Sequence, residues 1–333
     1  MTAPFINPVF DIALSYQKTA ALIAALKLDI FTKIGGDNVS LDDLQVRTGA
    51  SQRGLRILCD YLTVIGLLQK NETSYSLPYA SRNFLDKSSP LAMGAFVDFA
   101  AAQETIELVF RDPASYVMRG GSEGLALMSP DHPIWVRYAR TTMSFAGAKA
   151  KRVAKFVESF SEPVYTVLDI SAGHGLYGIE VAKAFPDALL TAIDWAPVLE
   201  VTKENAQAAG VSDRLRTIAG SAMEQDWGSD YDLILLPNFL HHFSFETCTT
   251  LLRKIKASLI PGGRAIGVEF VPNEDRISPP MPASFAFWML ATTPEGDAYT
   301  TSDLDKMARD AGFAGATTRP LAPDPDSLII FET

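Results

Sequence analysis

The sequence predicts an α/β protein in which a Rossmann-like, mostly parallel sheet follows a mainly α-helical N-terminal domain of the winged-helix type. Strand-like apolar runs alternate with helical patterns from about residue 164 onward, which is typical of a parallel sheet covered on both faces. A glycine-rich turn joins the first run to the first helix, whereas the chain before residue 90 shows short amphipathic helices and one short strand. We therefore expect two domains in this 333-residue chain, joined by a helical region.

The first domain is predicted over residues 1–90. Apolar residues at helical spacing run over 11–32, a second helix follows the capping residue Ser40, and a third covers 51–68. A short strand at 75–77 comes next. This order of elements is that of a winged helix.

We do not expect this winged helix to bind DNA. Residues 1–100 hold nine Lys and Arg against nine Asp and Glu, whereas a phosphate-binding face needs a surplus of positive charge. The third helix also carries too many apolar residues to lie in a DNA groove. A dimerising or structural role is the better interpretation.

The composition excludes several classes of protein. Acidic residues number 39 and basic residues 29, and the net charge of −10 argues against nucleic acid or an anionic membrane surface as the partner. Two cysteines, Cys59 and Cys248, give neither a disulfide framework nor a zinc cluster. We recognise no signal peptide and no spanning helix, so we expect a cytoplasmic protein.

The second domain is predicted over residues 161–333, after a helical linker at 91–160 that is rich in aromatic and methionine side chains. Such a linker usually forms core, and it could also line a cleft for an apolar small molecule. The strands of the second domain are predicted at 166–170, 189–193, 216–219, 233–236, 264–270 and 327–332, and its helices at 176–184, 198–209, 246–259 and 302–311.

The glycine-rich turn predicts a ligand site. Gly173, Gly175 and Gly178 form a G-x-G-x-x-G pattern between a strand and a helix, and Asp194 follows at the end of the next strand. The glycines allow the backbone to approach a ligand, and a carboxylate at the second strand can accept hydrogen bonds from ribose hydroxyls. Taken alone, this pattern also fits an NAD-dependent dehydrogenase.

Charge distinguishes the possible cofactors. Asp169 comes directly before the turn, where its carboxylate would oppose the pyrophosphate of a dinucleotide. S-adenosylmethionine carries a sulfonium and an ammonium and no phosphate, so an acid here favours it. After the third strand, Ala222 and Met223 could lie against an adenine. These features favour a methyl donor over a nicotinamide cofactor.

Taken together, the motifs at 169–175, 236–243 and 259–264, with Asp194 and Gly220, resemble class I S-adenosylmethionine-dependent methyltransferases. More narrowly, the whole chain is similar to the two-domain small-molecule O-methyltransferases of plants and their bacterial relatives. The resemblance implies a seven-stranded sheet with an antiparallel last strand and a homodimer with intertwined N-terminal domains. The candidate donor-binding residues are Asp169, Ser171, Gly173, Gly175, Asp194, Trp195, Gly220, Ser221, Ala222, Met223 and Asn238.

Methyl transfer to a hydroxyl needs alignment of the reactants and a base that removes a proton. Of the four histidines, His132 fits a turn and His174 fits a backbone role in the glycine loop, while His241 and His242 directly follow the fourth strand. That edge of a parallel sheet is where such folds bind ligands.

The resemblance implies that His241 is the general base, because the matching segment of plant members reads His-Asp-Trp. His242 stands where the family has Asp, and the carboxylate at the end of the fifth strand is kept as Glu269. A further family carboxylate falls on Ala298, with Asp297 beside it.

Two cofactor contacts of the family are also absent from this sequence. Plant members have a lysine at the position of Pro237 and an acid that contacts adenine at the position of Ser221. Donor binding must therefore depend more on Asp169, Asp194 and backbone groups.

The acceptor is predicted to be a small aromatic or polyketide-like molecule. Two alternatives stay open: a C-methyltransferase acting on a 2-oxo acid, with a metal held by the two histidines and Glu269, and a non-catalytic binding protein. The segment 279–290 occupies the place that covers the site in relatives. The candidate acceptor-pocket residues are Trp135, Tyr138, Met143, Phe239, Phe285 and Met289.

Overall fold

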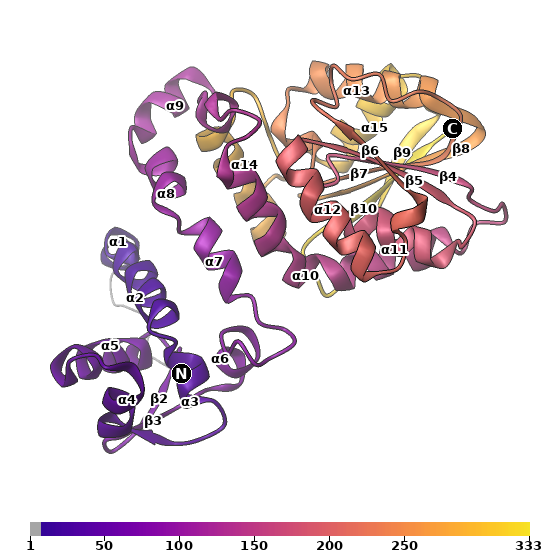
Figure 1. The fold of residues 1–333 in the computed structure, drawn as a ribbon. Helices are drawn as coiled ribbons and strands as arrows, with labels where there is room; N and C mark the ends of the chain where they lie inside the picture. Colours follow the sequence, from indigo (N-terminus) through magenta and orange to yellow (C-terminus); the bar gives the residue numbers. More distant parts are fainter. Residues whose placement is uncertain (1–7) are drawn as a thin grey trace. The chain divides into compact units, whose positions relative to one another are not determined.

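The computed structural model describes residues 8–333, which divide into two compact units, one up to Thr105 and one from Ile106 onward. Figure 1 shows the course of the chain. Across these described residues, no helix combines the length and apolar character needed to cross a membrane.

The first unit contains short helices and a small antiparallel sheet with strand order β1-β3-β2. The hydroxyls of Ser40 and Ser51 accept hydrogen bonds from the third backbone N–H that follows each of them, so both act as the helix caps that the sequence predicts. The elements are α1 (Pro8–Ala13), α2 (Ser15–Lys27), α3 (Ile30–Ile34), β1 (Val39–Ser40), α4 (Leu41–Thr48), α5 (Gln52–Val64), β2 (Gln69–Asn71), β3 (Ser74–Ser76), α6 (Tyr79–Phe84) and α7 (Gly94–Ala100).

The first predicted helix, at 11–32, is interrupted in the structure. Helix α2 ends at Lys27, and Asp29 adopts a left-handed backbone with φ of 58° before α3 begins. Because of this break, the side chains of Ile30, Phe31 and Ile34 point into the core of the unit, where each is at most 1% exposed. Burial of these side chains therefore outweighs the continuation of one helix.

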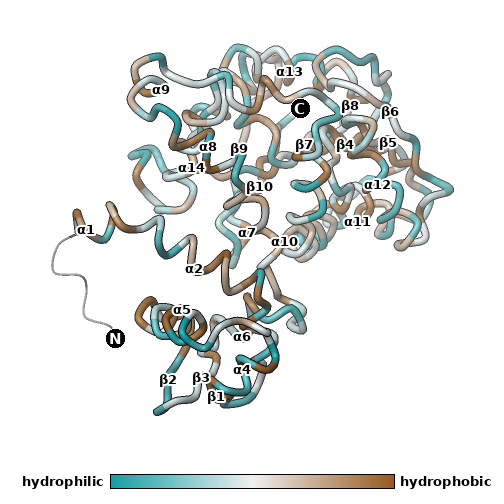
Figure 2. The backbone as a smooth tube through the Cα atoms, turned by 60° about the vertical axis from the view of Figure 1, so that its left-hand side comes forward, coloured by the Kyte–Doolittle hydropathy of each residue, from teal (hydrophilic) through white to brown (hydrophobic). Residues whose placement is uncertain are grey.

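Helix α1 presents apolar side chains to solvent. Phe10 is 62% exposed and Ile12 is 72% exposed, and Figure 2 shows this short helix in brown. Exposed aromatic and aliphatic side chains that cluster in this way often mark an interaction surface.

The second unit is built around a seven-stranded sheet with strand order β6-β5-β4-β7-β8-β10-β9, in which β10 runs antiparallel to both its neighbours. This confirms the predicted fold class. The elements are α8 (Gln103–Phe110), which crosses the boundary between the units, α9 (Pro113–Arg119), η1 (Gly124–Leu127), α10 (Pro133–Val157), β4 (Thr166–Ile170), α11 (Leu176–Ala184), β5 (Leu189–Asp194), α12 (Ala196–Ala208), η2 (Ser212–Arg214), β6 (Leu215–Ala219), β7 (Tyr231–Pro237), η3 (Leu240–His242), α13 (Phe245–Ser258), β8 (Leu259–Glu269), α14 (Pro280–Thr292), α15 (Thr301–Asp310), β9 (Gly315–Pro320) and β10 (Ser327–Glu332).

Helices cover both faces of this sheet, as Figure 1 shows. Alternate side chains of β7 point to opposite faces: Ile234 and Leu236 pack in a core with α13 and α15, whereas Leu233 and Leu235 pack in a core with α10 and α11. Because both faces are buried, β7 is apolar along most of its length rather than alternating with polar residues.

The pairing of the strands brings three carboxyl ends together. Asp169 of β4 pairs with Ala192 of β5 on one side and with Leu235 of β7 on the other. The segments that follow these strands therefore meet at one edge of the sheet, which is where ligands bind in open parallel sheets.

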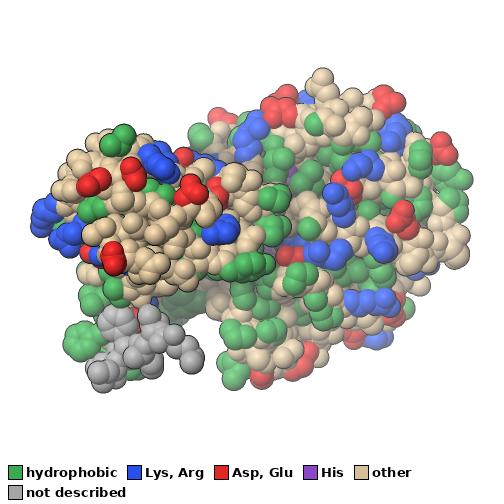
Figure 3. Space-filling view, turned by 90° about the horizontal axis from the view of Figure 1, so that it is seen from below, with side chains coloured by type: hydrophobic (Ala, Val, Ile, Leu, Met, Phe, Trp, Pro, Cys, Tyr) green, Lys and Arg blue, Asp and Glu red, His purple; other side chains and the backbone are tan. Residues whose placement is uncertain are grey.

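The surface carries mixed charge. Figure 3 shows one face on which Lys and Arg side chains are scattered among acidic and apolar ones.

Candidate active site

A cavity of about 400 Å³ lies within the second unit at the carboxyl ends of β4, β5 and β7. Its volume lies within the range of pockets that hold one small ligand. Residues of the glycine loop form one part of its lining, and aromatic side chains of α10 form another. Nine residues predicted from the sequence line it: Trp135, Tyr138, Ser171, Gly173, Asp194, Trp195, Asn238, Phe239 and His242.

Asp194 ties the glycine loop to the second strand. Its Oδ2 accepts a hydrogen bond from the Gly173 N–H at 2.8 Å, and its Oδ1 accepts one from the Trp195 N–H at 2.7 Å. Burial raises the pKa of the Asp194 carboxyl to about 6, although both N–H groups act in the opposite direction. At neutral pH, the ionised form remains an acceptor that faces the cavity.

Two glycines of the motif are required by close packing. A Cβ at Gly175, whose φ is +73°, would lie 2.5 Å from Thr202 Cγ2, and a Cβ at Gly178 would lie 2.6 Å from Leu190 Cδ1. The first glycine begins α11 and the second lets that helix pack on the sheet. Gly175 therefore shapes the loop without lining the cavity.

Asp169 lies beneath the loop rather than in the cavity lining. The residue is 0% exposed, its Oδ2 accepts a hydrogen bond from the Gly178 N–H at 3.0 Å, and its Oδ1 is buried with no hydrogen-bond partner among the described residues. Burial raises the pKa of this carboxyl to about 8. Asp169 therefore does not face the cavity, and its carboxyl is mostly protonated at neutral pH, so the structure does not show the charged contact with the donor that the sequence predicts.

Two polar residues at strand ends hold unusual backbone conformations. Ser171 after β4 and Asn238 after β7 both have φ of 53°, in the left-handed region, and both line the cavity. The backbone of Asn238 is held by a 2.7 Å hydrogen bond from its N–H to the Val268 carbonyl. Such strain is maintained by surrounding contacts and clusters at functional sites.

His174 in the loop is neutral at physiological pH. Its Nδ1 accepts a hydrogen bond from the Leu176 N–H at 3.1 Å. Burial and the nearby charge of Lys149 lower the pKa of this imidazole to about 4. The ring lines the cavity, in addition to the backbone role in the glycine loop that the sequence indicated.

His241 is paired with a carboxylate. Its Nδ1 lies 2.5 Å from Glu269 Oε2, and the other oxygen of Glu269 accepts hydrogen bonds from the N–H groups of Phe239 and Leu240. These three contacts fix the carboxylate and orient the imidazole, so that Nε2 is the nitrogen left to exchange a proton. His241 is 5% exposed, and its ring packs edge-on against Phe285.

His242, not His241, is part of the cavity lining. The two ring centroids are 4.3 Å apart. Burial, and secondarily the charge of His241, lowers the pKa of His242 well below its usual value. This ring is therefore a neutral wall of the cavity, with the His241–Glu269 pair directly behind it.

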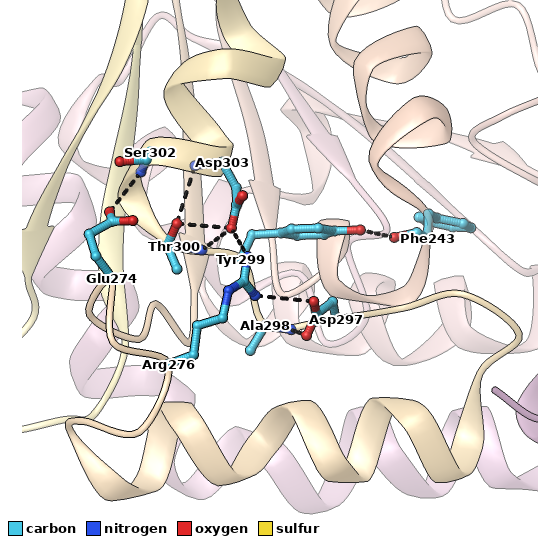
Figure 4. A network of polar contacts seen from close by, with 9 residues as sticks. All are labelled: Phe243, Glu274, Arg276, Asp297, Ala298, Tyr299, Thr300, Ser302 and Asp303. Carbon is cyan, nitrogen blue, oxygen red and sulfur yellow. Dashed lines mark hydrogen bonds and ion pairs between the residues drawn. The ribbon is translucent and has the colours of Figure 1, made fainter. Parts of the chain in front are cut away.

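The segment that follows α14 holds the backbone on both sides of His242, at His241 and at Phe243. The Asp297 N–H donates to the His241 carbonyl at 3.0 Å, and the Tyr299 hydroxyl donates to the Phe243 carbonyl at 2.5 Å. As Figure 4 shows, Arg276 reaches both Asp297 and Asp303, at 3.3 and 2.6 Å. The Asp297 side chain thus binds Arg276 rather than the imidazole, and the buried Ala298 carries no polar group in its place.

The remaining predicted residues lie outside the lining. Met143 packs with Trp135, and Met289 is buried in the core. Residues Asp169, Gly175, Gly220, Ser221, Ala222, Met223, Met143, Phe285, Met289, His241 and Glu269 are all outside it.

Several lining residues are not among the predicted site residues. Thr142, Phe145, Ala146 and Lys149 follow Trp135 and Tyr138 at helical spacing on α10, so one face of that helix forms a continuous wall. That spacing is visible in the sequence. Glu295, which also lines the cavity, had no comparable signal in the sequence. Over residues 8–333, no group of three or more His, Cys, Asp or Glu side chains is placed to hold a metal ion.

Comparison with known families agrees with this geometry. Residues 121–314 match the O-methyltransferase domain, and residues 10–87 match the O-methyltransferase dimerisation domain. The chain belongs to this O-methyltransferase family. This confirms the predicted methyl donor, S-adenosylmethionine, and excludes the nicotinamide alternative.

Individual relatives are similar over nearly their whole length. The chain is 24% identical to the tetracenomycin polyketide synthesis 8-O-methyl transferase TcmO of Streptomyces glaucescens, over 97% of this chain and 95% of that protein. It is 24% identical to the 3-hydroxy-5-methyl-1-naphthoate 3-O-methyltransferase of Streptomyces sahachiroi, over 92% and 89%. A solved structure assigned as an O-methyltransferase from Nostoc punctiforme is 43% identical, with a TM-score of 0.93 and coverage of 99% and 100%.

Proposed function

We propose that this O-methyltransferase methylates a hydroxyl of a small aromatic or polyketide-like molecule. The observation that carries the proposal is a single cavity in which the glycine loop and Asp194 share a lining with Trp135, Tyr138 and Phe239. Aromatic walls suit a planar acceptor. The names of the Streptomyces relatives, which describe polyketide and naphthoate methylation, support the same class.

The donor end of the cavity is assigned to the β5 side. S-adenosylmethionine supplies, when bound, a methyl group activated by its sulfonium. Asp194 would accept hydrogen bonds from the ribose hydroxyls, and the glycine loop allows the backbone to approach the ligand. Trp195, which directly follows Asp194, also lines the cavity.

His241 is our proposed general base. Glu269 contacts its Nδ1 and stabilises the imidazolium that forms when Nε2 takes the hydroxyl proton. His242 has no carboxylate contact among the described residues, and its lowered pKa makes it a poor proton acceptor. The acceptor must pass the His242 ring to reach His241, and side-chain rotation of this kind is common on binding.

Replacement of each histidine tests the assignment. We expect His241→Ala to lower kcat by about 10²- to 10⁴-fold, and His242→Ala to lower it less. Glu269→Gln should resemble the His241 variant. Affinity for S-adenosylhomocysteine, measured by calorimetry, should stay near the wild-type value in all three. A larger loss in His242→Ala than in His241→Ala would transfer the role to His242.

We further propose that the protein is a homodimer through its N-terminal domain, taken as residues 1–90. Support comes from the match to the dimerisation domain over residues 10–87 and from the exposed apolar side chains of α1.

A further inference from the structure

A buried ammonium group lies in the lining of the cavity. Lys149 of α10 is 3% exposed, and its Nζ lies 2.8 Å from Oδ2 of Asp326, which is 1% exposed. Removing two charges from water is costly, and their attraction offsets this cost only in part. A pair of this kind at a cavity wall therefore calls for an explanation beyond stability.

The ammonium of Lys149 has N–H donors available for a ligand. An ammonium carries three N–H donors, and the structure gives one of them an acceptor, Asp326, within the described residues. The ring of Phe145 lies 5.1 Å from Nζ and offers only its π face. Lys149 is also the sole Lys or Arg among the lining residues, all of which belong to the described part of the chain. An anion in this cavity has no other cationic side chain to meet.

The position of Lys149 relative to the sheet indicates which anion it meets. Asp194 ends β5, Ser171 follows β4 and Asn238 follows β7, in that spatial order. Asn238 Nδ2 is 3.5 Å from Oδ1 of Asp326, so the Lys149–Asp326 pair adjoins the β7 end of the cavity. The positive group is therefore separated from Asp194 by the width of β4.

We propose that Lys149 binds the α-carboxylate of the methionine part of S-adenosylmethionine, and that Asp326 positions Lys149 for this contact. With the ribose at Asp194, the opposite end of the donor extends across β4 toward β7, and that end carries its single anionic group. A charge-assisted hydrogen bond then satisfies an N–H group of Lys149. This inference rests on the proposed placement of the ribose at Asp194.

The test compares two donor analogues in one uncharged variant. The double variant Lys149→Met/Asp326→Asn removes both charges, so that no unpaired charge is left buried. Calorimetry would measure its affinity for S-adenosylhomocysteine and for the decarboxylated analogue, S-adenosyl-3-thiopropylamine, which keeps the ammonium and lacks the carboxylate. We expect the variant to bind S-adenosylhomocysteine about 10- to 100-fold more weakly than wild type and to bind the decarboxylated analogue as wild type does.

A matched control comes from the neighbouring ion pair. Arg152 and Asp324 join the same two segments, and neither lines the cavity. Arg152→Met/Asp324→Asn should therefore leave both affinities unchanged. An equal loss for both analogues in the Lys149 double variant, or no loss for either, would overturn the proposal. If the Asp194→Ala variant keeps wild-type affinity for both analogues, the ribose placement fails instead.

Discussion

Asp169 shows how burial determines the role of a single carboxyl group. Both faces of β4 are covered, so a side chain at this position is removed from water whichever way it points. Its single hydrogen bond, from Gly178, holds the start of α11 against the strand. With the pKa raised to about 8, the group is mostly protonated at neutral pH. The main role of the Asp169 side chain is therefore to hold the glycine loop in place.

The raised pKa gives a pH-dependent prediction for Asp169→Asn. In the wild type the folded protein keeps this proton up to about pH 8, whereas the unfolded chain loses it near pH 4. The contribution of Asp169 to the free energy of unfolding is therefore complete below pH 4, decreases up to about pH 8, and is constant above that. The amide does not titrate, so the stability of the variant relative to wild type should rise from pH 6 to pH 8 in urea unfolding. A difference that is independent of pH would contradict the raised pKa.

The sequence could identify the residues of the site better than their orientation. The acid before the loop, the second-strand acid and the two histidines all lie at the predicted edge. Which of two adjacent histidines faces the cavity depends on the short helical turn η3 and on Glu269, which is 28 residues further along the chain. Neither the η3 turn nor the contact with Glu269 can be predicted from the spacing of nearby residues in the sequence. Lys149 was missed because a single basic residue in a helix normally indicates a solvated face.

At the scale of elements, one tight contact shapes the outer edge of the cavity. The segment 121–124 packs directly on the end of α14: the Ser122 N–H donates to the Thr293 carbonyl at 2.8 Å. A Cβ at Gly121 would lie 1.9 Å from the Pro294 carbonyl oxygen. Two segments far apart in sequence thereby hold both Leu125 and Glu295 in the lining.

We expect Gly121→Ala to disturb this contact. The added methyl group meets backbone, which cannot rotate away, so the free energy of unfolding should fall by about 1–3 kcal/mol. Affinity for an aromatic acceptor should fall as well. Gly147→Ala is the control, because Gly147 lies in α10 with open space around the added methyl, and helix propensity predicts a gain of roughly 0.5–1 kcal/mol. Thermal and urea unfolding measure both. Equal stability of the two variants would show that the contact can relax.

Elements with a strong apolar pattern were predictable, and those without one were not. Strand β9 is absent from the predicted strands, because Thr317, Thr318 and Arg319 lack the apolar pattern that marks a buried strand. The sheet nevertheless reaches seven strands through β9, as the family resemblance implied. The helix break at Asp29 likewise depends on packing against the rest of the unit, and no glycine or proline in the sequence predicts it.

At the scale of the whole molecule, the match to a dimerisation domain predicts the association state. The full chain should sediment as a dimer at micromolar concentration. Phe10→Glu/Ile12→Glu places charges on the exposed apolar face of α1 and should shift the equilibrium toward monomer. Leu189→Glu/Ile277→Glu adds the same charge at exposed apolar positions of the second unit and should remain dimeric. A wild type that sediments as a monomer would refute the dimer, whereas a dimeric Phe10/Ile12 variant would place the interface elsewhere.

The cytoplasmic location and the three-part domain boundaries stay predictions. Both rest on composition and charge, and neither the location nor the boundaries depend on a particular contact of the fold.

The cavity takes its floor and its walls from different sources. Three neighbouring strand ends form the floor, and their spacing is fixed by backbone pairing along the entire sheet. The walls come from side chains of one long helix and from the short segment after α14. Mutations in those walls could accumulate without disturbing the nucleoside end, so descendants of this enzyme could acquire new acceptors while retaining the same source of methyl groups.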